Sequence, residues 1–133
     1  MAIFDLFGKK EVPGEGLYVI YTSLHPFRLY SHKSDFVELE VSLQNVYSAE
    51  LLTSLVVVVP KGIGFEQSVL SQQREIRVGQ MKPGEEKRFK IPIWASQRTD
   101  RGAYALRVYA VSHYHDYGHV LNEAKKEVRL RVE

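Results

Sequence analysis

The sequence predicts an all-β protein in which two sheets pack face to face, and three observations lead there. Apolar and polar residues alternate with a period of two along most of the chain, as in half-buried strands. Turn-forming residues separate these segments, and no segment of useful length combines a helical repeat with helix caps. A chain of 133 residues, 44% apolar and 26% charged, fits one domain whose core needs no disulfide or structural metal.

The alternation divides the chain into seven expected strands. They are residues 17–21, 37–43, 52–59, 74–78, 86–95, 104–110 and 128–132. Turn signals lie between them at Asn45 and Ser48, and at residues 60–62, 82–85 and 100–102. Residues 52–59 are almost continuously apolar, which predicts a central strand covered on both faces. Pro92 cannot donate a ladder hydrogen bond, so the strand at residues 86–95 is expected either to lie at a sheet edge or to contain a bulge.

The segment from Asp100 to Tyr104 (Asp-Arg-Gly-Ala-Tyr) is typical of a tyrosine corner. In such a corner a tyrosine near the start of a strand turns its hydroxyl back onto the upstream backbone. We therefore expect a buried Tyr104 whose hydroxyl is bonded to the backbone of the turn. Together with the strand count, this predicts a seven-stranded antiparallel immunoglobulin-like β-sandwich over residues 16–133, preceded by an N-terminal arm and lead-in at residues 1–15.

Four segments occur in an order that resembles prokaryotic immunoglobulin-like domains of the CARDB type. They are Val-Ser-Leu-Gln-Asn at 41–45, Val-Val-Val-Pro-Lys-Gly at 57–62, Met-Lys-Pro-Gly-Glu-Glu at 81–86 and Gly-Ala-Tyr-Ala-Leu-Arg-Val at 102–108. The resemblance covers roughly residues 35–133, and the strand pattern is also similar, more weakly, to arrestin-like sandwiches. It implies the fold and says little of activity, although such domains commonly serve as adhesion or spacer modules in secreted multidomain proteins.

The composition of the chain argues against several classes of function. There are no cysteines, so thiol chemistry is absent, and a net charge of +2 gives no sign of nucleic-acid binding. The longest apolar run, residues 55–59, is far shorter than the roughly 20 residues that cross a bilayer, so no integral membrane segment is expected. No export signal or nucleophile motif is evident. We therefore expect a cytoplasmic protein that is not an enzyme and needs no cofactor.

The segment 113–119 (His-Tyr-His-Asp-Tyr-Gly-His) is the densest group of potential metal ligands. His113 and His115 stand two residues apart, so on a strand they would point to the same, outward side. Asp116 or His119 could add a third ligand past the strand end, which suits zinc or another divalent metal. The alternative is an exposed polar loop that covers one end of the sandwich.

Two further features indicate a protein partner. Alternation places Trp94, the single tryptophan, on the face opposite Ile91 and Ile93, and exposed tryptophan is a favoured interface anchor. The arm carries four large apolar residues (Ile3, Phe4, Leu6 and Phe7) that could dock on the parent domain, on a sheet edge or at a membrane surface. The sequence thus favours a non-catalytic interaction or scaffold module, which could form a homodimer. The alternative is a metal-binding protein that uses the histidine-rich loop.

Overall fold

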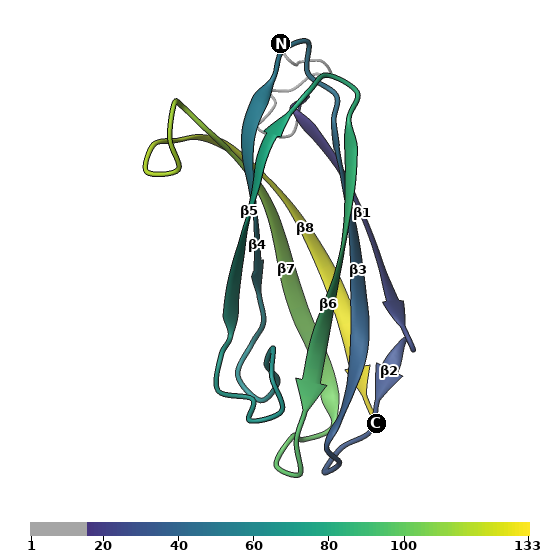
Figure 1. Cartoon of the computed structure of the whole chain (residues 1–133). Coiled ribbons are helices and arrows are strands. Elements are labelled where there is room, and N and C mark those ends of the chain that lie inside the picture. The colour runs from purple at the N-terminus through teal and green to yellow at the C-terminus, as the bar shows by residue number, and fades with distance from the viewer. Residues whose placement is uncertain (1–15) are drawn as a thin grey trace.

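The computed structural model describes residues 16–133, and every element in this part of the chain is a β-strand (Figure 1). The strands are β1 (Tyr18–His25), β2 (Arg28–Leu29), β3 (Asp35–Asn45), β4 (Leu51–Val58), β5 (Gln73–Met81), β6 (Glu86–Ala95), β7 (Gly102–His113) and β8 (Val120–Val132). Residues 16–133 therefore contain no helix long and apolar enough to span a membrane. The arm residues Ile3, Phe4, Leu6 and Phe7 lie outside the described residues.

The strands form two facing sheets. Sheet A has the order β1-β3-β6, and sheet B has the order β2-β8-β7-β4-β5. The all-β prediction is confirmed, but the expected seven antiparallel strands are wrong in one respect. After His25 the chain passes from sheet A to sheet B, where Arg28 and Leu29 pair in parallel with Arg131 and Val132 of β8. A pairing of two residues is too short to produce a readable alternation, so the sequence did not reveal this eighth strand.

The core lies between the sheets and follows the predicted alternation. Val37, Leu39 and Val41 of β3 are fully buried, whereas Glu38 and Glu40 between them face solvent. Leu106 and Val108 of β7 and Leu130 of β8 fill the opposite side of the same core. Ile63 and Phe65, from the connection between β4 and β5, close one end. Because each sheet buries one face, most of the hydrophobic stabilisation depends on these inward residues.

Strand β4 is central in its sheet but is covered on only one face. It pairs with β5 on one side and β7 on the other. Leu55 and Val57 point into the core and are buried, whereas Val56 and Val58 are half-exposed on the outer face of sheet B. The expectation that both faces of residues 52–59 are covered is therefore wrong. Valine fits either face of a pleated sheet, so a run of valines hides which side is solvated.

Strand β6 lies at the edge of sheet A, as Pro92 predicts. The backbone of Trp94 bonds outward to Gly64, with N–H···O distances of 2.7 and 3.0 Å. Residues two apart on a strand direct their backbones to the same side. The nitrogen of Pro92 therefore also faces away from β3, where no ladder bond is needed.

The hydrogen bond predicted for the tyrosine corner is present. The Tyr104 hydroxyl donates to the carbonyl oxygen of Asp100 at 2.7 Å. The ring packs beside the core but is half-buried rather than buried, because it covers the end of the sandwich next to Gly62. A Cβ atom at Gly62 would lie 3.2 Å from the Tyr104 ring, and Gly62 has a positive φ of 106°, so both features favour glycine there.

We expect Tyr104→Phe to lower the free energy of unfolding by about 1 kcal/mol, the net worth of one hydrogen bond. Chemical denaturation of both proteins measures the difference. Tyr114→Phe is a suitable control, because Tyr114 is exposed on the loop between β7 and β8. An unchanged stability for Tyr104→Phe would show that the bond does not hold the corner.

Candidate interaction surface

The outer face of sheet A combines a polar groove with a partly exposed aromatic pair. Its side chains come from alternate positions of three strands, in register across the sheet. One row joins Tyr21, Ser42 and Arg88, and the next joins Ser23, Glu40 and Lys90. At the far end Phe36 lies opposite Trp94. The face is thus polar over most of its length and aromatic at one end.

The aromatic end is a stacked pair. The rings of Phe36 and Trp94 lie 4.7 Å apart between centroids and are tilted by 33°. Trp94 is half-buried, and Phe36 keeps 44% of its surface exposed. Trp94 therefore points outward as predicted, but Phe36 covers part of it. Sequence reasoning did not select Phe36, because the pairing depends on the register between β3 and β6.

Gly64 holds the tryptophan in place from the side. Its backbone makes the two hydrogen bonds to Trp94 described above. A Cβ atom at Gly64 would approach the Ser71 carbonyl oxygen and the Val69 Cα atom to 2.9 Å, closer than such contacts allow. Only glycine lets the connection between β4 and β5 pass this close. The backbone of Trp94 is therefore held by Gly64 on the side that faces away from β3.

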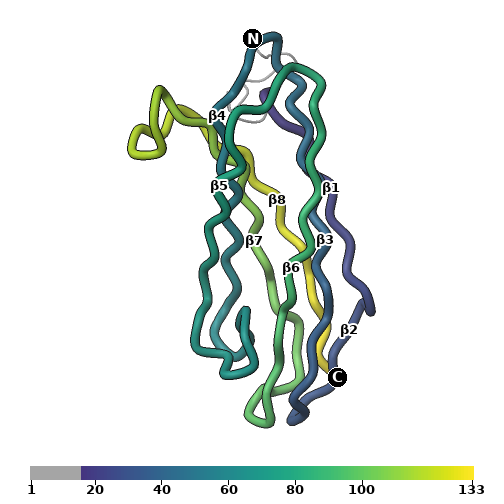
Figure 2. Tube along the Cα trace, in the orientation of Figure 1, coloured from purple at the N-terminus to yellow at the C-terminus, as the bar shows by residue number. Residues whose placement is uncertain are grey.

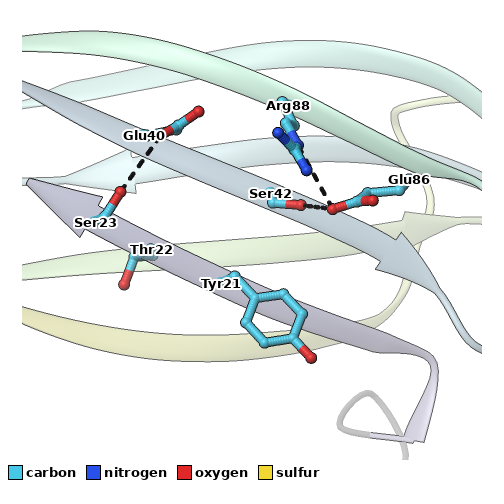
Figure 3. A pocket seen from close by; sticks show the side chains of 7 residues that line it. All are labelled: Tyr21, Thr22, Ser23, Glu40, Ser42, Glu86 and Arg88. Carbon is cyan, nitrogen blue, oxygen red and sulfur yellow. Dashed lines mark hydrogen bonds and ion pairs between the residues drawn. The ribbon is translucent and has the colours of Figure 1, made fainter.

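The polar end forms an open groove of about 360 Å³ (Figure 3). Its lining residues are Tyr21, Thr22, Ser23, Glu40, Ser42, Glu86 and Arg88. Glu86 anchors one part of it, since its carboxylate accepts a hydrogen bond from Ser42 and lies 3.7 Å from the Arg88 guanidinium. Carboxylates, hydroxyls and a guanidinium on one surface offer both donors and acceptors to a partner.

Ser23, His25 and Glu40 gather beside this groove, but not as a nucleophilic triad. The Ser23 hydroxyl lies 2.9 Å from His25 Nε2, and it donates to Glu40 Oε1 at 3.5 Å. Glu40 Oε1 in turn lies 3.7 Å from the same imidazole nitrogen. In a triad the carboxylate orients the other nitrogen, Nδ1. The arrangement therefore supplies polar contacts rather than an activated serine.

Of the four predicted metal ligands, Asp116 and His119 are hydrogen-bonded to each other, whereas His113 is buried. His113 ends β7 and is only 7% exposed, although it lies on the outer face of sheet B as expected. Its Nε2 atom lies 2.8 Å from the Ser54 hydroxyl, and the Tyr117 ring covers it edge-on at 5.0 Å. Its Nδ1 atom is buried with no hydrogen-bond partner. The expectation that His113 is open to an ion is wrong, because the following loop folds over it.

The other three residues lie in the exposed loop that extends from the ends of β7 and β8 (Figure 2). Asp116 Oδ1 is 2.8 Å from His119 Nδ1 and accepts the backbone N–H of Gly118. The bond from His119 lowers the pKa of the Asp116 carboxyl. His115 instead packs on Tyr114, with ring centroids 4.0 Å apart. Within residues 16–133 no three histidine, cysteine, aspartate or glutamate side chains are placed to hold a metal ion. The zinc site remains a prediction, to be checked by metal analysis of untagged protein.

Burial lowers the pKa of His113 below its ordinary value of 6.5. Glu75 opposes this shift, Arg77 adds to it, and Asp116 opposes it. In the unfolded chain the imidazole takes up its proton at the ordinary pKa. Just below pH 6.5 the unfolded state therefore binds more protons than the folded state, and stability falls as the pH falls.

We expect stability to fall as the pH drops below about 6.5, and we expect this loss to depend on His113. The difference in unfolding free energy between the wild type and His113→Gln should shrink as the pH is lowered, because glutamine does not titrate. Urea unfolding at several pH values measures it. A difference that stays constant, or grows toward acid, would contradict the role of His113.

No family model and no curated protein matches the sequence, whereas solved structures match the fold. A fragment of Escherichia coli alpha-2-macroglobulin from domain MG7 to the C-terminus is 13% identical, with a TM-score of 0.61 over 90% of this chain and 17% of that one. The FixG-related protein from Vibrio parahaemolyticus is 10% identical, with a TM-score of 0.56 over 87% of this chain and 96% of that one. The sporulation control protein Spo0M from Bacillus subtilis is 14% identical, with a TM-score of 0.51 over 89% of this chain and 50% of that one.

These similarities agree with an immunoglobulin-like sandwich and, at such low identity, concern the fold alone. The chain spans about a sixth of the macroglobulin fragment. The resemblance to CARDB domains finds no support among these structures.

Proposed function

We propose that the chain is a non-catalytic interaction module that binds a protein partner through the outer face of sheet A, centred on Phe36 and Trp94. The observation that carries this proposal is a stacked, partly exposed aromatic pair at one end of a sheet face whose other end forms a polar groove. An aromatic anchor surrounded by polar groups is the usual composition of a binding hot spot. The similarity to immunoglobulin-like domains agrees with a scaffold role but does not identify a partner.

Capture from the source cells, with quantitative mass spectrometry, tests the proposal. Trp94→Ala should deplete a specific partner at least tenfold, because hot-spot truncations weaken binding by about 2 kcal/mol or more. Tyr114→Ala is a matched control on the loop between β7 and β8, and it should retain the partner. A partner lost equally with both variants, or with neither, would refute the proposed surface.

We also propose that the protein self-associates through the arm residues Ile3, Phe4, Leu6 and Phe7 and acts in the cytoplasm. The apolar composition of residues 2–7 and the absence of cysteines support these two proposals. Deleting residues 1–10 should shift the assembly toward the monomer while the sandwich stays folded. Light scattering measures the mass, and a full-length chain that is monomeric at high concentration would contradict the dimer.

A further inference from the structure

The two sheets have four edge strands, and one of them, β2, has only two residues. The other three differ in how they are protected from pairing with another strand. β5 carries Arg74, Glu75 and Arg77, and its pairing with β4 is interrupted next to Gly79. β6 carries Pro92 and the bridge to Gly64. β1 has none of these features: residues 18–24 contain no charged side chain, no proline and no irregularity in the register with β3. Charges, prolines and bulges are the means by which proteins block edge pairing. Among these three edges β1 is therefore the most open to strand addition.

The register shows which backbone groups β1 offers. The carbonyl oxygen of Leu17 accepts the N–H of Val46 at 2.9 Å, so odd-numbered residues of this strand face β3. The even-numbered residues Ile20, Thr22 and Leu24 direct their backbone groups away from the sheet. On this edge the Ile20 carbonyl oxygen receives a hydrogen bond from Lys126 Nζ, at 3.4 Å. A side chain thus occupies an acceptor that a neighbouring strand would otherwise use.

The surroundings of this edge select the chemistry of the added strand. An opening of about 210 Å³ lies between β1 and β8, lined by Tyr18, Ile20, Ala124, Lys125 and Lys126. Both charged residues at this opening are lysines. A second copy of the chain, paired through its own β1, would bring another set of lysines to the same side of the joined sheet. Like charges there oppose such a pair, whereas carboxylates would favour binding.

We propose that the free edge of β1 binds an extended, acidic segment of a partner protein as a fourth strand of sheet A. This inference rests on the proposed interaction function and names a second surface for it. The main chain of the segment would bond to Ile20, Thr22 and Leu24. Its inward carboxylates would pair with Lys126 and draw the ammonium group away from the Ile20 carbonyl oxygen, which frees that acceptor for the added strand. Its outward apolar side chains would pack on Tyr21, which is 59% exposed.

Two synthetic peptides test the proposal: acetyl-Val-Glu-Val-Glu-Val-Glu-Val-amide and the same peptide with lysine in place of glutamate. The full chain should bind the glutamate peptide at least tenfold more tightly. Amide hydrogen exchange should slow at Ile20, Thr22 and Leu24 on binding, but not along β5 or β6. Equal affinity for the two peptides, no binding of either, or protection of another edge would overturn the proposal.

Three variants sharpen the test. Thr22→Pro removes an outward N–H without touching the bonds to β3, and it should abolish binding of the glutamate peptide. Lys90→Pro, on the free edge of β6, is its matched control and should bind like the wild type. Lys126→Glu should reverse the preference between the peptides, which a merely unfolded variant cannot do. Trp94→Ala should bind the peptide normally. The two proposals can fail separately. If the peptides do not bind but Trp94→Ala still loses the captured partner, strand addition at β1 is refuted and the proposed function stands.

Discussion

Val57→Asp is expected to unfold the protein under conditions in which Val58→Asp remains folded. Val57 is 1% exposed and points between the sheets, so an aspartate there would bury a charge with no partner. Such a substitution costs about 4 kcal/mol or more, a large fraction of the stability of a single domain. Val58 is half-exposed, and Arg107 lies directly opposite on the same outer face. Its aspartate stays hydrated beside a cation, so we expect a loss of about 1 kcal/mol.

Urea unfolding followed by tryptophan fluorescence measures both free energies, because Trp94 is the single tryptophan. The two variants share strand, chemistry and charge, and they differ in the face that they occupy. An equally severe effect of Val58→Asp would show that the outer face of sheet B is covered in solution. A harmless Val57→Asp would contradict the arrangement of the core itself.

The same pair of residues shows what the sequence could reveal of the fold. Where polar residues separate apolar ones, as Glu38 and Glu40 do in β3, the buried face follows directly from the alternation. In β4 the consecutive valines fit either the buried or the solvated face of the sheet. Only the packing of the two sheets shows which valines face the core. The tyrosine corner was predictable because its bond spans four residues, from Tyr104 to Asp100. The brief β2 pairing joins residues about a hundred positions apart and has no local signal.

The candidate surfaces depended on register, which a single sequence does not give. The outward direction of Trp94 followed from alternation, whereas its contact with Phe36 required the alignment of β3 with β6. The histidine-rich segment was visible, but the burial of His113 depends on Ser54, 59 residues away, and on how the loop places Tyr117. Residue types that suit a metal were therefore recognisable, while the burial of His113 was not.

Asn45→Ala is expected to lower the free energy of unfolding by about 3 kcal/mol. Asn45 is fully buried at the end of β3. Its amide nitrogen donates to the carbonyl oxygens of Ala49 and Met81 at 3.0 and 2.8 Å, and its side-chain oxygen accepts the N–H of Tyr47 at 2.8 Å. One side chain thus joins the turn after β3 to the end of β5. Alanine would leave these groups without partners, at about 1 kcal/mol or more for each one that water cannot reach.

Asn45→Asp separates the hydrogen bonds from simple loss of volume. An aspartate keeps the acceptor for Tyr47, but an ionised carboxylate cannot donate to the carbonyl oxygens of Ala49 and Met81. Its buried charge would face two carbonyl oxygens, so we expect Asn45→Asp to be less stable than Asn45→Ala at neutral pH. Asn122→Ala on β8 is the matched control, because the side chain of Asn122 is half-exposed and the Ser112 hydroxyl bonds to the Asn122 backbone carbonyl oxygen, which alanine keeps. Urea unfolding ranks the three variants. If Asn45→Asp were as stable as the wild type, the side chain at position 45 would be solvated. Backbone hydrogen bonds alone would then join the turn after β3 to the end of β5.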